Sequence, residues 1–256
     1  MAVARLTLRF FRRELRNRFA GSFTGGLWAL LQPLVQLAVY AFVFVHVFKA
    51  RVPGADAPGY VPFLVTALWP WTAFSEAILR STTAVQDNAA LIGKVALPRE
   101  VLVVATAASS FAVHIAGFVA ILIVLALTGS GVTIAGLAPA LLLYIPLFAL
   151  ALGFALICAA LQVFVRDLVQ ALGQLMMLLM FAAPIFYDAQ QMPENVRGWL
   201  ALNPFTFYAD AFRAVLLHHG TIGIERVLVA LAIAAIVLFA GHALFRRLDP
   251  HFEDFL

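Results

Sequence analysis

The chain has 256 residues, of which 64% are hydrophobic and only 12% are charged, and its formal net charge is +4 at pH 7. Soluble globular proteins are about half apolar and about a quarter charged, so this composition excludes that class and indicates an integral membrane protein. The basic excess does not indicate nucleic-acid binding, because the basic residues are distributed as membrane topology requires. The single cysteine, Cys158, excludes an internal disulfide and a cysteine-based metal cluster.

Residues 1–26 are expected to form an amphipathic helix at the cytoplasmic membrane surface. In a helical projection one face is apolar and the opposite face is basic. The apolar face carries Leu8, Phe11, Leu15 and Phe19. The basic face carries Arg9, Arg13 and Arg16, whose cations are expected to point toward lipid phosphates. Two interpretations stay open: a topology anchor, or a helix that also shapes an entrance for an anionic lipid headgroup.

Six segments are long and apolar enough to cross a bilayer, which takes about 20 residues in a helix. They are residues 27–48, 60–79, 101–127, 137–165, 168–187 and 227–245. Arg166 and Asp167 separate the fourth and fifth segments and predict a turn, because a continuous helix would bury this charge pair in lipid. We expect the pair to be structural, with transmission of motion as the alternative.

The fold expected is therefore all-α, with six transmembrane helices in a single domain over residues 1–256. With both termini in the cytoplasm, the inner segments hold 12 of the 17 lysines and arginines, as the positive-inside rule requires. In this orientation residues 80–100 form a cytoplasmic loop, and residues 188–226 lie on the outer side.

The cytoplasmic loop 80–100 contains a short helical segment over residues 83–92. An isolated helix of that length is marginal in water, so it is expected to dock on another protein, with a solvated connector as the alternative. The expected docking residues are Asp87, Asn88, Leu91, Ile92 and Lys94. Gly93-Lys94 is not a phosphate-binding loop, because that motif requires glycine at position 88 and serine or threonine at position 95. We expect no nucleotide site or other cofactor in this chain.

The outer segment 188–226 is expected to form a hairpin of two short helices that break at Asn203-Pro204. On the second helix, Phe205, Tyr208 and Phe212 belong to one apolar face. Thr206, Asp210 and Arg213 share a polar face. Non-spanning backbone at membrane depth is tolerated where it is buried in protein or lines a watery cavity. The hairpin is therefore expected to dip into the membrane as a lid over an exit, with a surface-lying element as the alternative.

Four stretches, in order along the whole chain, resemble type-2 ABC exporter permeases, and more narrowly the Wzm and TagG group that exports O-antigen, teichoic acid and related glycans. They are RELRNRFAGSFTGGLWALLQPL, NAALIGKVALPRE, VRDLVQALGQLMMLLMFAAPIFY and MPENVRGWLALNPFTFYADAFR. The resemblance implies a homodimer in a bacterial inner membrane. It also implies two copies of a separate ATPase that carries ATP and Mg, and a channel for a lipid-linked glycan at the dimer interface.

Several aromatic residues and one acid are candidates for that channel or its gate, since aromatic rings can support the apolar faces of sugars. They are Trp28, Phe74, Glu76, Phe186, Tyr187, Trp199, Phe205, Tyr208 and Phe212. Aromatic residues also anchor helices at membrane interfaces, so both interpretations stay open. Glu76 is a functional candidate because it is ionisable inside a span, whereas His114 is expected to hydrogen-bond a neighbouring helix.

Three other functions compete with glycan export. One keeps the family and changes the cargo to a drug or simple lipid. Another is a membrane-embedded sugar transferase or acyltransferase, for which Asp210, His218 and His219 are the only local candidates. A secondary transporter is disfavoured, because the chain has no recognisable internal repeat and no relay of buried acids.

Overall fold

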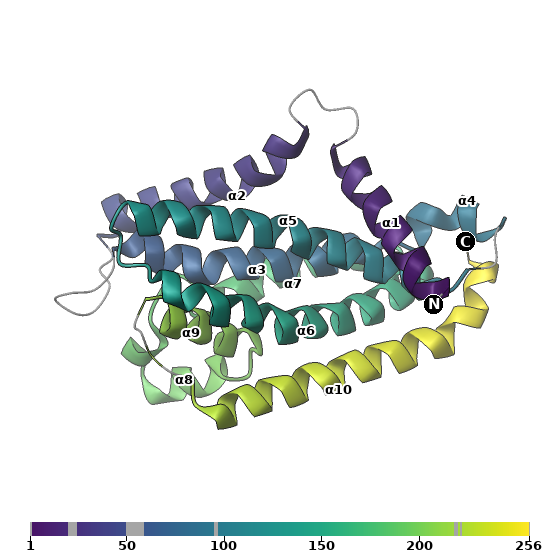
Figure 1. Cartoon of the computed structure of the whole chain (residues 1–256). Coiled ribbons are helices and arrows are strands. Elements are labelled where there is room, and N and C mark those ends of the chain that lie inside the picture. Colours follow the sequence, from purple (N-terminus) through teal and green to yellow (C-terminus); the bar gives the residue numbers. More distant parts are fainter. Residues whose placement is uncertain are drawn as a thin grey trace.

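The computed structural model describes residues 2–19, 25–49, 59–94, 97–217, 220 and 222–255, and every regular element in these ranges is a helix. Most of the long helices run side by side along an elongated bundle (Figure 1). The short helices α8 (Glu194–Leu200) and α9 (Phe205–Leu216) lie at one end, which we call the hairpin end. The helix α1 (Ala2–Phe19) and the last turns of the chain lie at the opposite end, called the terminal end.

The remaining helices make up the bundle. They are α2 (Gly25–Phe42), which continues as a π-helical turn (Val43–Val47), α3 (Tyr60–Thr82), α4 (Ala89–Ile92), α5 (Glu100–Leu127), α6 (Leu137–Phe164), α7 (Leu168–Phe181) and α10 (Ile224–Leu248). Within the described ranges, three helical segments are long and apolar enough to cross a membrane: 100–127, 134–164 and 224–253. Shorter apolar helices cover 31–47 and 168–181, so the count of six spans stays a prediction.

Helix α3 is the centre of the bundle and packs against α5, α6 and α9. Its apolar side chains are almost all buried, including Trp69, whose indole N–H donates to the backbone oxygen of His114 at 2.9 Å. The π-helical turn after α2 stacks Phe44 on Phe186, with 5.1 Å between the ring centroids. The sequence pattern of 60–79 therefore corresponds to a helix that faces protein on most sides.

Helices α6 and α10 pack along their length through two glycines. A Cβ atom on Gly153 would lie 2.6 Å from the backbone nitrogen of Leu238, and a Cβ atom on Gly241 would collide with the backbone oxygen of Gly153. Small residues let two helix backbones approach closely where lipid supplies no hydrophobic driving force. This contact fixes α10 to the bundle although most of its other side chains are exposed.

Candidate functional site at the two ends of the bundle

Helix α1 packs on the start of α5 at the terminal end. Phe10 is only 9% exposed and joins an apolar cluster with Val101 and Leu102. Leu8, on the predicted apolar face, is 47% exposed, as a side chain that faces lipid can be, whereas the face buried against protein is centred on Phe10. The buried face differs from the predicted apolar face because α1 packs on α5 of the same chain. The helical projection had been interpreted for a helix that contacts lipid alone. The side chain of Phe19 lies outside the described residues.

The three arginines of the predicted basic face do not act together. Arg9 and Arg16 are exposed, as expected. Arg13 instead donates a hydrogen bond to the side-chain oxygen of Asn88, and its guanidinium lies 4.8 Å from the ring centre of Phe10. Arg13 therefore joins α1 to the predicted docking loop, and contact of these arginines with lipid phosphates stays a prediction.

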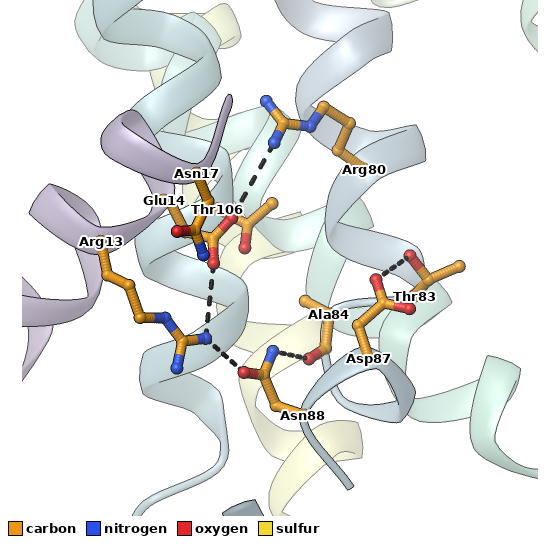
Figure 2. A pocket seen from close by; sticks show the side chains of 9 residues that line it. All are labelled: Arg13, Glu14, Asn17, Arg80, Thr83, Ala84, Asp87, Asn88 and Thr106. Atoms are coloured by element: carbon orange, nitrogen blue, oxygen red, sulfur yellow. Dashed lines mark hydrogen bonds and ion pairs between the residues drawn. The ribbon is translucent and has the colours of Figure 1, made fainter. Parts of the chain in front are cut away.

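A polar cavity of about 300 Å³ lies between α1, the end of α3 and the turn that follows it (Figure 2). Glu14 of α1 lies 3.5 Å from Arg13 and 3.9 Å from Arg80, measured between carboxylate oxygens and guanidinium nitrogens. Beyond α3, the Thr83 hydroxyl donates to the Asp87 carboxylate at 2.8 Å. Ion pairs of this length around a cavity hold α1 less tightly than direct side-chain packing does. Helix α1 is therefore held loosely where it faces this cavity.

Glu76 of α3 holds α1 to the bundle through short contacts. Its carboxylate lies 2.6 Å from a guanidinium nitrogen of Arg18 and 2.7 Å from Nε2 of His114, and it accepts a hydrogen bond from the Ser110 hydroxyl at 3.3 Å. Arg80 lies 3.6 Å away. A charge inside a bundle needs such partners to offset its desolvation. Glu76 thus joins α1, α3 and α5, and the expectation that His114 binds a neighbouring helix is confirmed.

The predicted helical segment 83–92 is shorter in the structure, as a 3₁₀ turn (Gln86–Asn88) and the single turn α4. Among the predicted docking residues, Asp87 and Lys94 are exposed. Leu91 and Ile92 are half-buried against the apolar cluster of α1 and α5. They therefore offer a partner protein less apolar surface than the sequence predicted.

The same segment is held from its other side by a pair of glutamines. The Gln86 amide donates to the backbone oxygen of Gln162 at 3.0 Å. The Gln162 side chain also donates to the Arg166 carbonyl at 2.8 Å and accepts the Val169 N–H at 2.9 Å, which holds the α6–α7 turn. The turn lies where predicted. The side chains of Arg166 and Asp167 are both exposed at this turn, so neither charge is buried between the two apolar helices.

At the hairpin end, Asn203 shapes the predicted break between α8 and α9. Its side-chain oxygen accepts the Phe205 N–H at 3.0 Å, and its amide donates to the Leu179 carbonyl of α7 at 3.0 Å. The predicted apolar face of α9 is buried as expected, and Phe212 packs against the ring of Tyr144 at a centroid distance of 5.1 Å. The hairpin is therefore fixed to α7 and to the core by specific contacts.

Burial separates the predicted channel residues into two groups. Side chains in the protein core are Phe74, Phe186, Phe205, Tyr208 and Phe212. Those that are exposed or half-buried are Trp28, Trp199, Tyr187 and Glu76. Phe205 packs on Trp71 of α3 with 4.9 Å between the ring centroids, so this ring helps to anchor the hairpin, and a role of these residues in a channel stays a prediction.

Arg213 of α9 lines one cavity with Thr206 and Asp210, in agreement with the predicted polar face, but its side chain is buried. It is 4% exposed and donates to the backbone oxygens of Pro184 at 2.5 Å and Ile185 at 2.7 Å, in the turn after α7. Its guanidinium also lies 3.5 Å from the ring centre of Phe63. The carbonyls of an irregular turn need donors, and a long cation can reach them from a neighbouring helix. Burial lowers the pKa of Arg213 to about 10, so the group stays charged at neutral pH.

Sequence reasoning missed Arg18, Gln86 and Gln162. Gln162 had a signal, since it is a lone polar side chain near the end of an apolar stretch. The enzyme alternative relied on Asp210 with His218 and His219, and the two histidines lie outside the described residues. Within the described part of the chain, no group of three or more His, Cys, Asp or Glu side chains is placed to hold a metal ion.

Comparison with known proteins gives evidence that is independent of the structure. The sequence model of the ABC-2 type transporter family matches residues 5–217. The chain is 28% identical to an O-antigen export system permease protein RfbA of Myxococcus xanthus, over 97% of this chain and 94% of the relative. It is 27% identical to an RfbA of Klebsiella pneumoniae, over 95% and 92%. It is 24% identical to a polysialic acid transport protein KpsM of Escherichia coli, over 92% and 90%. The chain therefore belongs to the ABC-2 type transporter family of multi-pass membrane permeases.

Proposed function

We propose that this chain is the permease subunit of an ATP-driven exporter of a lipid-linked polysaccharide in a bacterial inner membrane. It works as a homodimer with two copies of a separate cytoplasmic ATPase, which binds ATP and Mg. The proposal is supported by relatives named for O-antigen export and polysialic acid transport, which align over more than nine-tenths of this chain.

The observation that carries the mechanism is the placement of the segment 86–94. It exposes Asp87 and Lys94, and it is bonded to α1 through Arg13 and to the α6–α7 turn through Gln162. A protein that docks on the exposed side displaces both attachments together. Docking of the ATPase thereby moves α1 and the α6–α7 turn at the same time.

Motion of the α6–α7 turn reaches the hairpin end through α7. Arg213 ties α9 to the turn after α7, and Asn203 ties the α8–α9 break to α7 itself. A shift of α7 relative to α3 therefore moves the hairpin, which acts as the outer lid. Among the predicted channel residues, Trp28 and Trp199 have exposed rings that are available to a passing glycan.

Co-purification tests this function directly. The tagged chain is extracted gently from its host with charge reversals at the exposed positions, Asp87→Arg combined with Lys94→Glu. We expect the native chain to retain an ATPase subunit at near-equal amount and the double variant to lose it. Arg197→Glu, an exposed change on α8, is the matched control. If the double variant retains the ATPase, the docking site lies elsewhere in the chain. If no ATPase co-purifies with the native chain, the proposal is overturned.

A further inference from the structure

The six-residue turn η5 (Asp249–Asp254), which follows α10 at the terminal end, makes contacts that the mechanism above does not use. It is a 3₁₀ helix that lies beside α4 at this end of the bundle (Figure 1). The side chains of His251 and Glu253 are exposed, whereas the ring of Phe252 between them is completely buried. The buried ring therefore marks the place where the turn is attached to the rest of the protein.

Phe252 belongs to an apolar cluster that includes part of the predicted docking loop. Val85, the residue before the segment 86–94, is completely buried in the same cluster, and Ile92 of α4 packs against it. The other buried members come from α5, α6 and α10, and one of them, Phe245, lies with its ring centroid 5.3 Å from that of Phe252. Through this cluster the η5 turn supports the segment 86–94 near both of its ends.

Arg99, at the start of α5, fastens the η5 turn from outside the apolar cluster. Its guanidinium is mostly buried and donates to the backbone oxygen of Asp249 at 2.6 Å and to the Asp249 carboxylate at 3.1 Å. It also donates to the carboxylate of Glu253. A planar guanidinium has several donors in fixed directions, so one side chain can hold both the first residue of the turn and its fifth.

The end of α6 is a further attachment of the turn. Phe164, the last residue of α6, lies with its ring centroid 5.9 Å from that of Phe252 and 4.8 Å from that of Phe255. The α6–α7 turn begins directly after Phe164. The η5 turn therefore links α10 to the two structures that Gln86 and Gln162 already join, namely the segment 86–94 and the end of α6.

The segment 86–94 depends on such support for its shape. It contains one 3₁₀ turn and the single turn α4, and helices this short are unstable in water unless tertiary packing stabilises them. The apparent affinity of a partner for such a segment falls with the fraction of molecules in which the segment has its binding shape. A buried ring that stabilises the segment can therefore control docking without contacting the partner.

We propose that the η5 turn positions the segment 86–94 for docking of the ATPase, through the buried ring of Phe252 and the attachment of the turn to Arg99. Phe252 is a positioning residue, because its side chain is closed to a partner and acts through the cluster that contains Val85. This inference rests on the proposed function, since it adds a determinant to the same docking site.

Two matched changes in the full chain test the inference. Phe252→Ala removes the supporting ring, and Phe118→Ala removes an equally buried ring that packs on Phe212 of the hairpin. We expect Phe252→Ala to raise the apparent dissociation constant for the ATPase recovered with the native chain about tenfold. It should also speed backbone hydrogen exchange in residues 84–92 of the ATPase-free protein. Phe118→Ala should lower the unfolding temperature but leave ATPase binding and exchange in residues 84–92 unchanged.

Further variants keep the test decisive. If Phe252→Ala does not fold, Phe252→Leu and Phe118→Leu replace the pair, with a smaller effect in the same direction. Arg99→Lys loses the planar fork and should speed exchange in residues 84–92 and 249–254. Equal ATPase binding by the two phenylalanine variants overturns the inference, as does weaker binding with unchanged exchange in residues 84–92. A native chain that retains no ATPase overturns the proposed function instead, so the two failures are distinguishable.

Discussion

The guanidinium of Arg18 lies 2.6 Å from the carboxylate of Glu76, which joins the N-terminal helix to the central helix of the bundle. Both side chains are mostly buried, so neither charge is well solvated by water. The contact turns α1 from a surface anchor into a part of the bundle that shares a charge cluster with α3 and α5.

This pair is expected to be energetically coupled. Arg18→Gln, Glu76→Gln and the double change form a cycle whose coupling free energy of unfolding is about 1–3 kcal/mol, because Glu76→Gln removes the carboxylate that pairs with Arg18 and Arg18→Gln removes the nearest guanidinium from Glu76. Thermal or denaturant unfolding of the detergent-solubilised protein measures it. Purely additive single effects would mean that Glu76 relies on His114 and Ser110 instead.

Arg213 is expected to need its guanidinium shape as well as its charge. Arg213→Lys keeps the cation but loses the planar fork whose two terminal nitrogens each donate to one carbonyl, of Pro184 and of Ile185, at a cost of about 2 kcal/mol. Faster backbone hydrogen exchange in α9 and in residues 182–187 is the expected readout. Arg197→Lys, at an exposed position on α8, is the control, and equal exchange in the two variants contradicts the assignment.

The contact between α6 and α10 is expected to tolerate no side chain at Gly241. Gly241→Ala places a Cβ atom against the Gly153 carbonyl and forces the helices apart, which lowers stability by about 1–3 kcal/mol. Gly173→Ala in α7 is the matched change in open space and is expected to raise stability by up to about 1 kcal/mol, since alanine favours helix. Measured unfolding temperatures check the argument: that of Gly241→Ala should fall, and that of Gly173→Ala should rise. Similar effects at both positions would contradict close packing at Gly241.

Gln162 is expected to transmit motion without taking part in docking. Gln162→Leu removes the side-chain bonds to Gln86, Arg166 and Val169 while the exposed docking side of the segment 86–94 is left intact. The variant should retain the ATPase in co-purification and lose most of its export. Gln170→Leu, at an exposed position in α7, should keep both. Loss of ATPase binding in Gln162→Leu would place this residue in the docking surface.

Composition and periodicity alone determined the all-helical class and the approximate positions of the long apolar helices. The apolar stretches correspond to helices because a chain of this hydropathy must satisfy its backbone inside the segment. The α6–α7 turn at Arg166-Asp167 and the hairpin break at Asn203-Pro204 were also readable, because local polar and proline residues end helices. Resemblance over the whole chain supplied the family.

Only the tertiary structure decided which faces meet protein. The buried face of α1 is centred on Phe10 because α5 lies beside it, and a helical projection holds no information about a neighbouring helix. Arg213 turned inward for the same reason, since the carbonyls that it satisfies lie near residue 185, far away in sequence. Apart from Arg80 of the same helix, the partners of Glu76 come from residues 18, 110 and 114, which packing of separate helices brings together. Local pattern thus determines helices and breaks, whereas the pairing of buried polar groups depends on which helices become neighbours.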